Sequence, residues 1–243
     1  MNSSRRGFTI IETMLVLAIT GLVASVVLVS IGSALRNEQY HSAVDQIYDY
    51  FQGQYSLSSA ILNDRASDDE CTSGGLTQAG NGLGRGTSSC YIVGKVIKST
   101  DGTTIESYQA IALDDVADAT KFPGEANKNP KTVLEDAHIT QGRTVTTYDV
   151  RGESGVKLTK PNGTAGAFTL LIARSPITGR IHTFVSDTRQ ETPQVSTMTE
   201  VDLKLCVNPD GLINVGIQQS GILVTKSAAN SSAVKLLGSG QCV

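Results

Sequence analysis

The sequence predicts an α+β fold in which one long N-terminal helix packs on an antiparallel β-sheet head. Two observations predict this fold. The run from Phe8 to Leu35 is apolar except for one ionisable side chain, Glu12, and helical spacing of apolar residues continues beyond it. After Cys90, short β-branched segments alternate with turns that contain Gly, Asp and Asn. The 243 residues suit one domain of ordinary size with an appended segment.

The segment 8–35 is long enough to cross a membrane. At about 1.5 Å per residue, a helix over this segment spans roughly 42 Å, more than the ~30 Å hydrocarbon core of a bilayer. Arg5 and Arg6 precede it, which favours a cytoplasmic amino end and export of the rest of the chain. The run is too long for an ordinary secretory signal. We therefore expect a single pass through the inner (cytoplasmic) membrane.

Glu12 has no role in a plain membrane anchor. A carboxylate inside a membrane span costs a few kcal/mol unless it is paired or lies near an interface. Glu12 stands near the start of the run, which lowers this cost without giving the residue a use. An unpaired glutamate near the interface is therefore one interpretation, and a paired one is the alternative.

The residues Gly7-Phe8-Thr9-Ile10-Ile11-Glu12, which follow a short basic leader, resemble the processing site of type IV prepilins and pseudopilins. The resemblance implies that residues 1–7 are a leader peptide, cut between Gly7 and Phe8 by the prepilin peptidase, and that the new Phe8 amine is methylated. It also implies assembly with other pilin subunits, at an inner-membrane platform, into a filament outside the cell. Glu12 would then meet the amine of a neighbouring subunit.

Physical chemistry is consistent with that role of Glu12. A carboxylate beside a cationic amine in a medium of low dielectric constant is strongly favoured over an unpaired carboxylate. Each added subunit could advance until its amine meets a carboxylate. The pair would therefore set the register between neighbouring helices, as buried polar residues do in coiled coils.

An amphipathic helix is expected over 36–62, continuous with the apolar one. Its apolar stripe is Tyr40, Val44, Ile47, Phe51, Tyr55 and Leu62. No Pro occurs between Phe8 and Asn63, and Gly21 and Gly32 are the only helix-breaking residues of the apolar run, so local unwinding near Gly21 is the alternative to a continuous helix. The stripe predicts packing against the core of the head.

The region 63–243 is expected to be a β-rich head stapled by disulfides. Cys71 and Cys90 enclose one Gly- and Ser-rich stretch, and Cys206 and Cys242 enclose another. Four cysteines allow three connectivities, and pairing of neighbours is favoured after an export signal. A zinc site or free thiols are the alternatives, but no Cys-x-x-Cys spacing occurs.

Nine segments of the head have the composition of strands, and residues 63–90 are expected to form a surface loop. "FTLLIARSPITGRIHTFVS" is typical of a hairpin. The predicted strands are 90–99, 106–113, 143–150, 155–160, 167–174, 180–186, 200–207, 211–218 and 221–226.

Composition and motifs argue against catalysis and against a dedicated nucleic-acid binder. The net charge is −3, the three histidines are isolated, and no cofactor motif occurs, so we expect no enzyme, no cofactor and no metal site. Asp114, Asp115 and Asp118 could hold calcium, but they lack the spacing of a calcium loop and are more typical of a solvated turn.

The expected function is that of a major or minor subunit of a type IV pilus, for adhesion, twitching motility or DNA uptake. Partners outside the filament would be DNA or a host surface. A local basic surface that could bind DNA is Lys95, Lys98, Arg143 and Arg180.

Two alternatives remain open. The first is a pseudopilin of a type II secretion system, since "LKLCVNPDGLINVGIQ" bears a weak likeness to the heads of H-type pseudopilins and fimbrial-T minor pilins. The second is a membrane-anchored binding or enzymatic domain that is never processed.

Overall fold

The structure is a computed structural model of the whole chain. It describes residues 9–60, 69–72, 75–78, 91–112, 131, 134–135, 138–152, 155–175, 179–210, 219–226, 230–238 and 240–242. The chain divides into two compact units, Met1–Ser42 and Ala43–Val243, and the second unit is called the head below.

One helix, α1 (Ile10–Ala60), runs through the first unit and into the head. It is helical at both Gly21 and Gly32, so the unwinding considered near Gly21 is not observed. The absence of Pro allows an unbroken backbone hydrogen-bond ladder. The predicted end of the helix, Leu62, lies outside the described residues.

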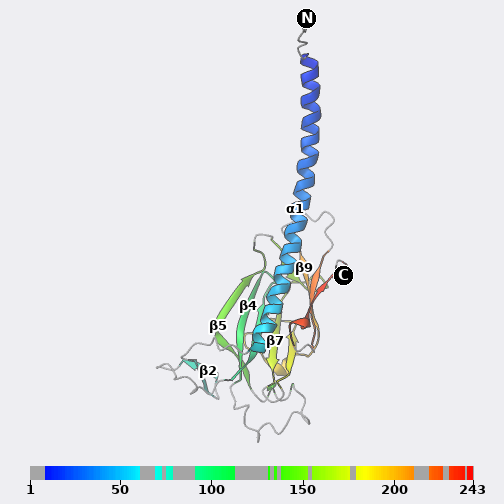
Figure 1. The fold of residues 1–243 in the computed structure, drawn as a ribbon. Coiled ribbons are helices and arrows are strands. Elements are labelled where there is room, and N and C mark those ends of the chain that lie inside the picture. The colour runs from blue at the N-terminus through cyan, green and yellow to red at the C-terminus, as the bar shows by residue number, and fades with distance from the viewer. Residues whose placement is uncertain are drawn as a thin grey trace. The chain divides into compact units, whose positions relative to one another are not determined.

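The head contains a five-stranded antiparallel sheet (Figure 1). Its order is β5-β4-β3-β7-β8. The strands are β3 (Tyr91–Ser99), β4 (Thr104–Ala112), β5 (Ile139–Asp149), β7 (Phe168–Arg174) and β8 (Ile181–Ser186). The hairpin predicted over 167–186 is confirmed, because β7 pairs with β8 and the Ser175 amide donates to the Arg180 carbonyl at 2.7 Å.

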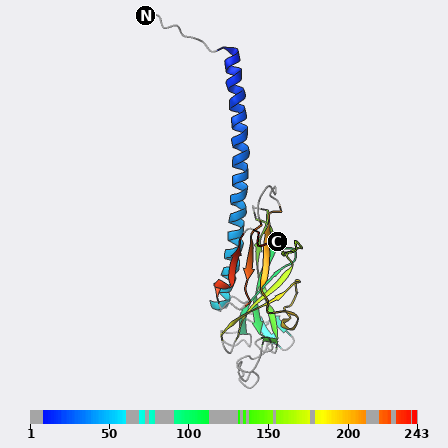
Figure 2. The same cartoon turned by 90° about the vertical axis from the view of Figure 1, so that its right-hand side faces the viewer.

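A second sheet of four strands lies in the same head, and Figure 2 shows its orange and red strands beside the green ones of the first sheet. Its order is β11-β10-β9-β6. The strands are β6 (Lys157–Thr159), β9 (Leu203–Asn208), β10 (Gly221–Val224) and β11 (Val234–Leu237). Short 3-10 helices, η2 (Val195–Thr197) and η3 (Ser231–Ala233), precede β9 and β11 respectively.

The head part of α1 packs on the five-stranded sheet through the predicted apolar stripe. Phe51 and Tyr55 are fully buried, and the Phe51 ring lies 6.3 Å from that of Phe168 in β7. Polar contacts accompany the apolar ones, since the Tyr55 hydroxyl bonds the Thr183 hydroxyl at 2.7 Å. Burial of the stripe thus fixes the Ala43–Ala60 part of α1 on the sheet.

The C-terminal end of α1 is capped by a residue from the sheet. The last turn of α1 has no basic residue. Arg174 of β7 donates from Nη1 to the Ser59 carbonyl at 3.4 Å and from Nε to the Gly179 carbonyl at 3.1 Å. A cation at this end of a helix is favourable because the last carbonyls carry partial negative charge.

The other face of the five-stranded sheet is also covered. Val195 and Met198, in the segment between β8 and β9, join Val96, Leu171 and Phe184 in one buried cluster. Burial on both faces explains why β7 is apolar at nearly every position instead of alternating.

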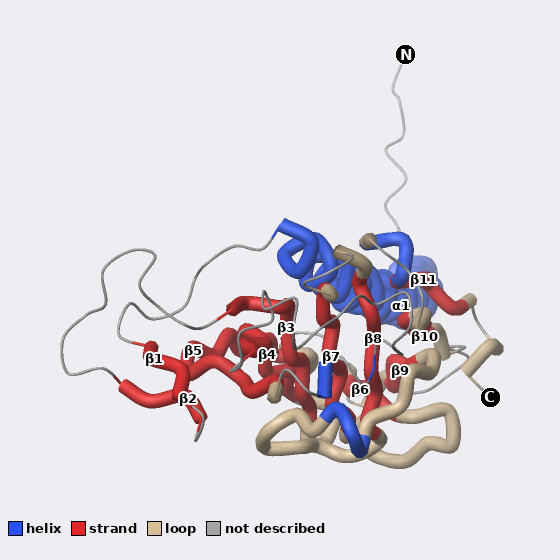
Figure 3. Tube along the Cα trace, turned by 90° about the horizontal axis from the view of Figure 1, so that it is seen from below, coloured by secondary structure: helices blue, strands red, loops and turns tan. Residues whose placement is uncertain are grey.

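The predicted α+β class is confirmed, and two details differ from the prediction. The expected surface loop 63–90 contains a hairpin, β1 (Asp69–Thr72) and β2 (Gly75–Gln78), which lies near β5 in Figure 3. Strand β11 was not expected at all. Because β1, β2 and β11 have only four residues each, their pairing depends on neighbouring strands more than on composition. The predicted strand 211–218 lies outside the described residues.

Candidate assembly site

Thr9 caps the amino end of α1. Its hydroxyl accepts a hydrogen bond from the Glu12 amide at 3.3 Å, and its carbonyl accepts one from the Thr13 amide at 3.1 Å. This is the geometry of an N-cap residue, which satisfies backbone amides that lack a partner in the first turn. Glu12 therefore occupies the third helical position, where partial positive charge at the helix end favours a carboxylate.

Three hydroxyl side chains of the apolar segment bond to carbonyls of their own helix. Thr13 donates to the Ile10 carbonyl at 2.9 Å, Thr20 to Val16 at 2.8 Å and Ser25 to Leu22 at 2.7 Å. Such back-bonding satisfies a hydroxyl without a neighbouring chain. These residues therefore do not require a polar partner from outside.

Glu12 differs from these residues. Within the described part of the chain, its carboxylate makes no hydrogen bond or ion pair, and apart from Thr9 and Thr13 its nearest neighbours along the helix are apolar. An ionised carboxylate can accept about four hydrogen bonds through its two oxygens. Glu12 is thus a polar group of this segment that a second chain could engage.

The rest of the segment presents apolar side chains outward. Ile11 is 78% exposed and Leu17 is 71% exposed. The most apolar window of α1 has a mean hydropathy of 2.7 and none of it is buried, so by length and composition α1 could cross a membrane. Exposed apolar surface of this extent indicates burial in a lipid bilayer or against other chains.

Several predicted residues cannot be placed. Gly7 and Phe8, the predicted cleavage pair, lie outside the described residues, as do Cys90 and the acidic residues Asp114, Asp115 and Asp118. In the described ranges, no group of three or more His, Cys, Asp or Glu residues could hold a metal ion.

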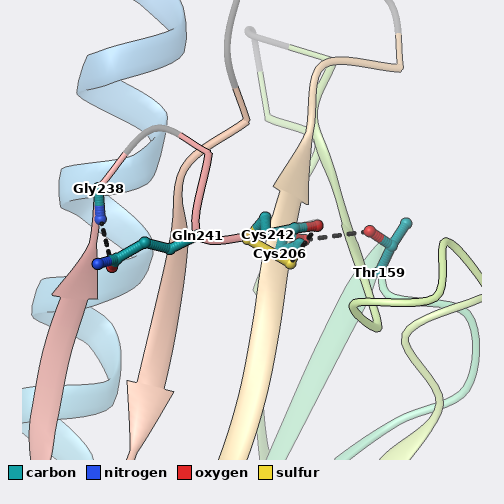
Figure 4. Close-up of a disulfide and its surroundings, with 5 residues drawn as sticks. All are labelled: Thr159, Cys206, Gly238, Gln241 and Cys242. Carbon is teal, nitrogen blue, oxygen red and sulfur yellow. Dashed lines mark hydrogen bonds between the residues drawn. A yellow bond between two sulfur atoms is a disulfide. The ribbon is translucent and has the colours of Figure 1, made fainter.

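One of the two predicted disulfides is present among the described residues. Cys206 in β9 bonds Cys242, 36 residues later (Figure 4). Gln241 helps to hold this end of the chain, because its Oε1 accepts from the Gly238 amide at 3.1 Å. The Cys206–Cys242 bond thereby ties the C-terminal segment to the four-stranded sheet. Cys71 is also disulfide-bonded.

The predicted basic surface is not a single patch. Lys98 is fully buried, so its inclusion was wrong: its Nζ donates to the Glu191 carbonyl and lies 4.9 Å from the centre of the Tyr108 ring. Burial lowers the pKa of the Lys98 amine. Arg143 in β5 and Arg180 beside β8 are exposed, but these strands are opposite edges of one sheet.

The buried lysine has a structural role. It lies next to an ion pair between Arg189 and Glu106, 3.0 Å apart, and a hydrogen bond at 2.9 Å from Tyr108 to Glu106. Together these contacts hold the segment after β8 against the face of the five-stranded sheet that α1 does not cover. Lys98 belongs to the packing of the head and not to a binding surface.

Thr9 was not singled out from the sequence, although a signal was available. Thr9 and Glu12 have the Thr-x-x-Glu spacing of a capping box directly before an apolar run. Arg174 had no comparable signal, because its partner Ser59 is far away in sequence.

Comparison with known proteins identifies the N-terminal segment. Residues 2–28 match a family model described as "Prokaryotic N-terminal methylation motif". No curated protein and no solved structure matches the chain. The matched residues include Gly7, Phe8, Thr9 and Glu12. The motif implies processing by a prepilin peptidase and assembly with other pilin subunits, and it supports a structural, processed subunit of the type IV pilin and pseudopilin type.

Proposed function

We propose that this chain is a subunit of a type IV pilus-like filament, cut between Gly7 and Phe8 and assembled through the apolar half of α1. The match of residues 2–28 to the methylation motif is the observation that carries the proposal. Before assembly the chain crosses the inner membrane once, with its amino end in the cytoplasm. After assembly the heads are displayed outside the cell, for adhesion, motility or DNA uptake.

Glu12 is proposed to pair with the Phe8 amine of a neighbouring subunit. Two features support this role: the carboxylate has no partner within the described residues, and apolar side chains of the same segment, such as Ile11 and Leu15, are exposed. Inside a bundle of such helices, an unpaired carboxylate would be strongly disfavoured. The pair would therefore select one register out of many that apolar packing alone permits.

Mass spectrometry of the mature amino terminus tests the proposed processing. The expected result is a chain that begins with N-methylated Phe8 in cells that contain a prepilin peptidase. Cells without the peptidase provide the control, in which residues 1–7 should remain attached. An intact leader in peptidase-containing cells would favour the permanently anchored domain instead.

The variant Glu12→Val tests the proposed register role. We expect export and cleavage to continue while incorporation into sheared filaments falls at least tenfold, because the Phe8 amine loses its partner. Thr13→Val is the matched control: it also replaces a polar side chain with Val, but the Thr13 hydroxyl is already satisfied by the Ile10 carbonyl. Normal assembly of Glu12→Val would rule out the register role.

A pseudopilin of a type II secretion system is the second candidate. The apolar half of α1 serves both functions equally, and the likeness near the C-terminus falls partly on residues 211–218, outside the described ones. Neighbouring genes distinguish the candidates: a retraction ATPase accompanies a pilus, and secretion genes with an outer-membrane secretin accompany a pseudopilus.

A further inference from the structure

Among the described residues, β5 pairs only with β4, so it forms an open edge of the five-stranded sheet. Residues 143–147 are all exposed, and Val145 is 45% exposed. A strand covered on even one face would show alternate buried and exposed residues. The β1–β2 hairpin forms a separate sheet and does not pair with β5. An open edge strand is a template for pairing with another chain.

The ladder between β4 and β5 shows which backbone groups are available. The Val150 amide donates to the Thr103 carbonyl at 2.9 Å, in the same register as the pairs along β4 and β5. Hydrogen-bonded pairs alternate with non-hydrogen-bonded pairs in an antiparallel ladder. The amides and carbonyls of Val145, Thr147 and Asp149 therefore point away from β4, toward the open edge.

The other sheet edges differ in how they are protected. Thr199 bridges to Val185 on the edge strand β8, and Ala165 bridges to Thr159 on the edge strand β6. No such bridge is found on β11 within the described residues. The Thr225 amide donates to the Ala233 carbonyl at 2.9 Å, which by the same alternation turns the backbone groups of Val234 and Leu236 outward. Leu236 is 46% exposed.

We propose that the β5 edge of one subunit pairs in parallel with the β11 edge of a second copy of this chain. The inference rests on the proposed filament, in which identical heads are neighbours. Figure 1 shows β5 and β11 on opposite flanks of the head, with both strands pointing toward the same end. A contact between two different patches is heterologous and can continue from copy to copy, as a filament requires.

The free groups are compatible with one register. If Thr147 lies opposite Lys235, its amide can donate to the Val234 carbonyl and its carbonyl can accept from the Leu236 amide. The Asp149 amide then donates to the Leu236 carbonyl. The Val234 amide is not required, which is consistent with its existing bond to the Ser231 carbonyl.

The side chains are complementary in the same register. Tyr148, whose ring stacks on Tyr50 of α1 at 4.5 Å, would lie opposite the exposed Leu236. Lys235 makes no ion pair with the described residues and would lie diagonally across from Asp149. Cross-strand apolar contacts and opposite charges both stabilise strand pairs.

Photo-crosslinking in sheared filaments of the full chain tests the pairing. Benzoylphenylalanine replaces Tyr148, which keeps an aromatic ring against Tyr50. After irradiation, reduction and trypsin digestion, we expect residue 148 joined to the peptide 236–243 of a second copy. Benzoylphenylalanine at Val201, also 45% exposed, is the control and should not label that peptide. Adding Thr147→Pro, which removes an outward amide at an edge position where Pro is tolerated, should reduce the crosslink at least fivefold, whereas Thr147→Ala should not.

Each outcome has one meaning. The 148 to 236–243 crosslink, lost with Thr147→Pro and kept with Thr147→Ala, supports the pairing. Filaments in which residue 148 labels another protein, another peptide or nothing overturn the pairing and leave the proposed function intact. A chain that keeps its leader or forms no filament overturns both.

Discussion

The two halves of α1 differ in whether the chain itself buries their apolar side chains. In the half before Leu35, apolar residues surround the helix and remain exposed, as with Leu17. In the half from Ala43 to Ala60, apolar residues form one stripe, and the head buries it, as with Phe51. The second half is satisfied within the chain, and the first half requires a membrane or other subunits. One continuous helix therefore contains both an exposed apolar surface available for assembly and an apolar stripe that is part of the core of the head.

The largest expected effect separates the two halves directly. Phe51→Ala should lower the free energy of unfolding of the head by about 3–5 kcal/mol, because it opens a cavity between α1 and β7. Leu17→Ala is the matched change in the other half and should leave head stability unchanged while reducing assembly. Urea unfolding of each full-length variant in detergent, followed by tyrosine fluorescence, measures the stability of the head, and the yield of sheared filaments measures assembly. Equal losses in the two variants would contradict the division.

The next effect concerns the disulfide of the head, whose contribution to stability should not depend on the first half of α1. Replacing both Cys206 and Cys242 with Ser should lower the free energy of unfolding by about 4 kcal/mol, the chain-entropy cost for a loop of 36 residues. Urea unfolding of the variant and of the parent, both without a reductant, checks this, because a reductant would also break the disulfide of Cys71. The Leu17→Ala background should show the same loss, since the first half of α1 has no part in this bond.

The sequence predicted the elements whose pattern is local. The uniform apolar run, the stripe through Ile47 and Phe51, and the hairpin over 167–186 all follow from spacing along a single segment, and the structure bears them out. The β1–β2 hairpin and β11 escaped prediction because four-residue strands depend on their partners.

The candidate sites follow the same distinction. The methylation motif could be identified from the sequence because its residues are contiguous. Lys98 was misplaced because β3 is buried on both faces, so alternation along that strand no longer indicates which side chains reach solvent. The open edges of β5 and β11 follow from pairing over long distances in sequence, which composition does not reveal.

A smaller effect tests the polar contact within the buried half of α1. Tyr55→Phe should cost about 1 kcal/mol at pH 7, because the Thr183 hydroxyl loses its partner. Burial raises the pKa of Tyr55 to about 12 from 10.0. The unfolded chain ionises first above pH 10, so the contribution of Tyr55 is present below pH 10 and declines as the pH rises toward 12. Unfolding free energies at pH 7 and 11 should therefore show a smaller difference between variant and parent at pH 11. A constant difference would contradict the raised pKa.

The smallest effect lies at the exposed end of α1. Thr9→Ala removes the hydroxyl that accepts from the Glu12 amide, and loss of an N-cap costs about 1 kcal/mol. Hydrogen exchange of the Glu12 amide in detergent should therefore become about fivefold faster, since 1.4 kcal/mol corresponds to a factor of ten. Thr13→Ala is the control, because the Thr13 hydroxyl donates to a carbonyl and protects no amide in the first turn. Head amides should be unaffected in both variants, because the fraying is confined to the first turn of a half-helix that the head does not bury. Faster exchange in the head after Thr9→Ala would show that the two halves are coupled after all.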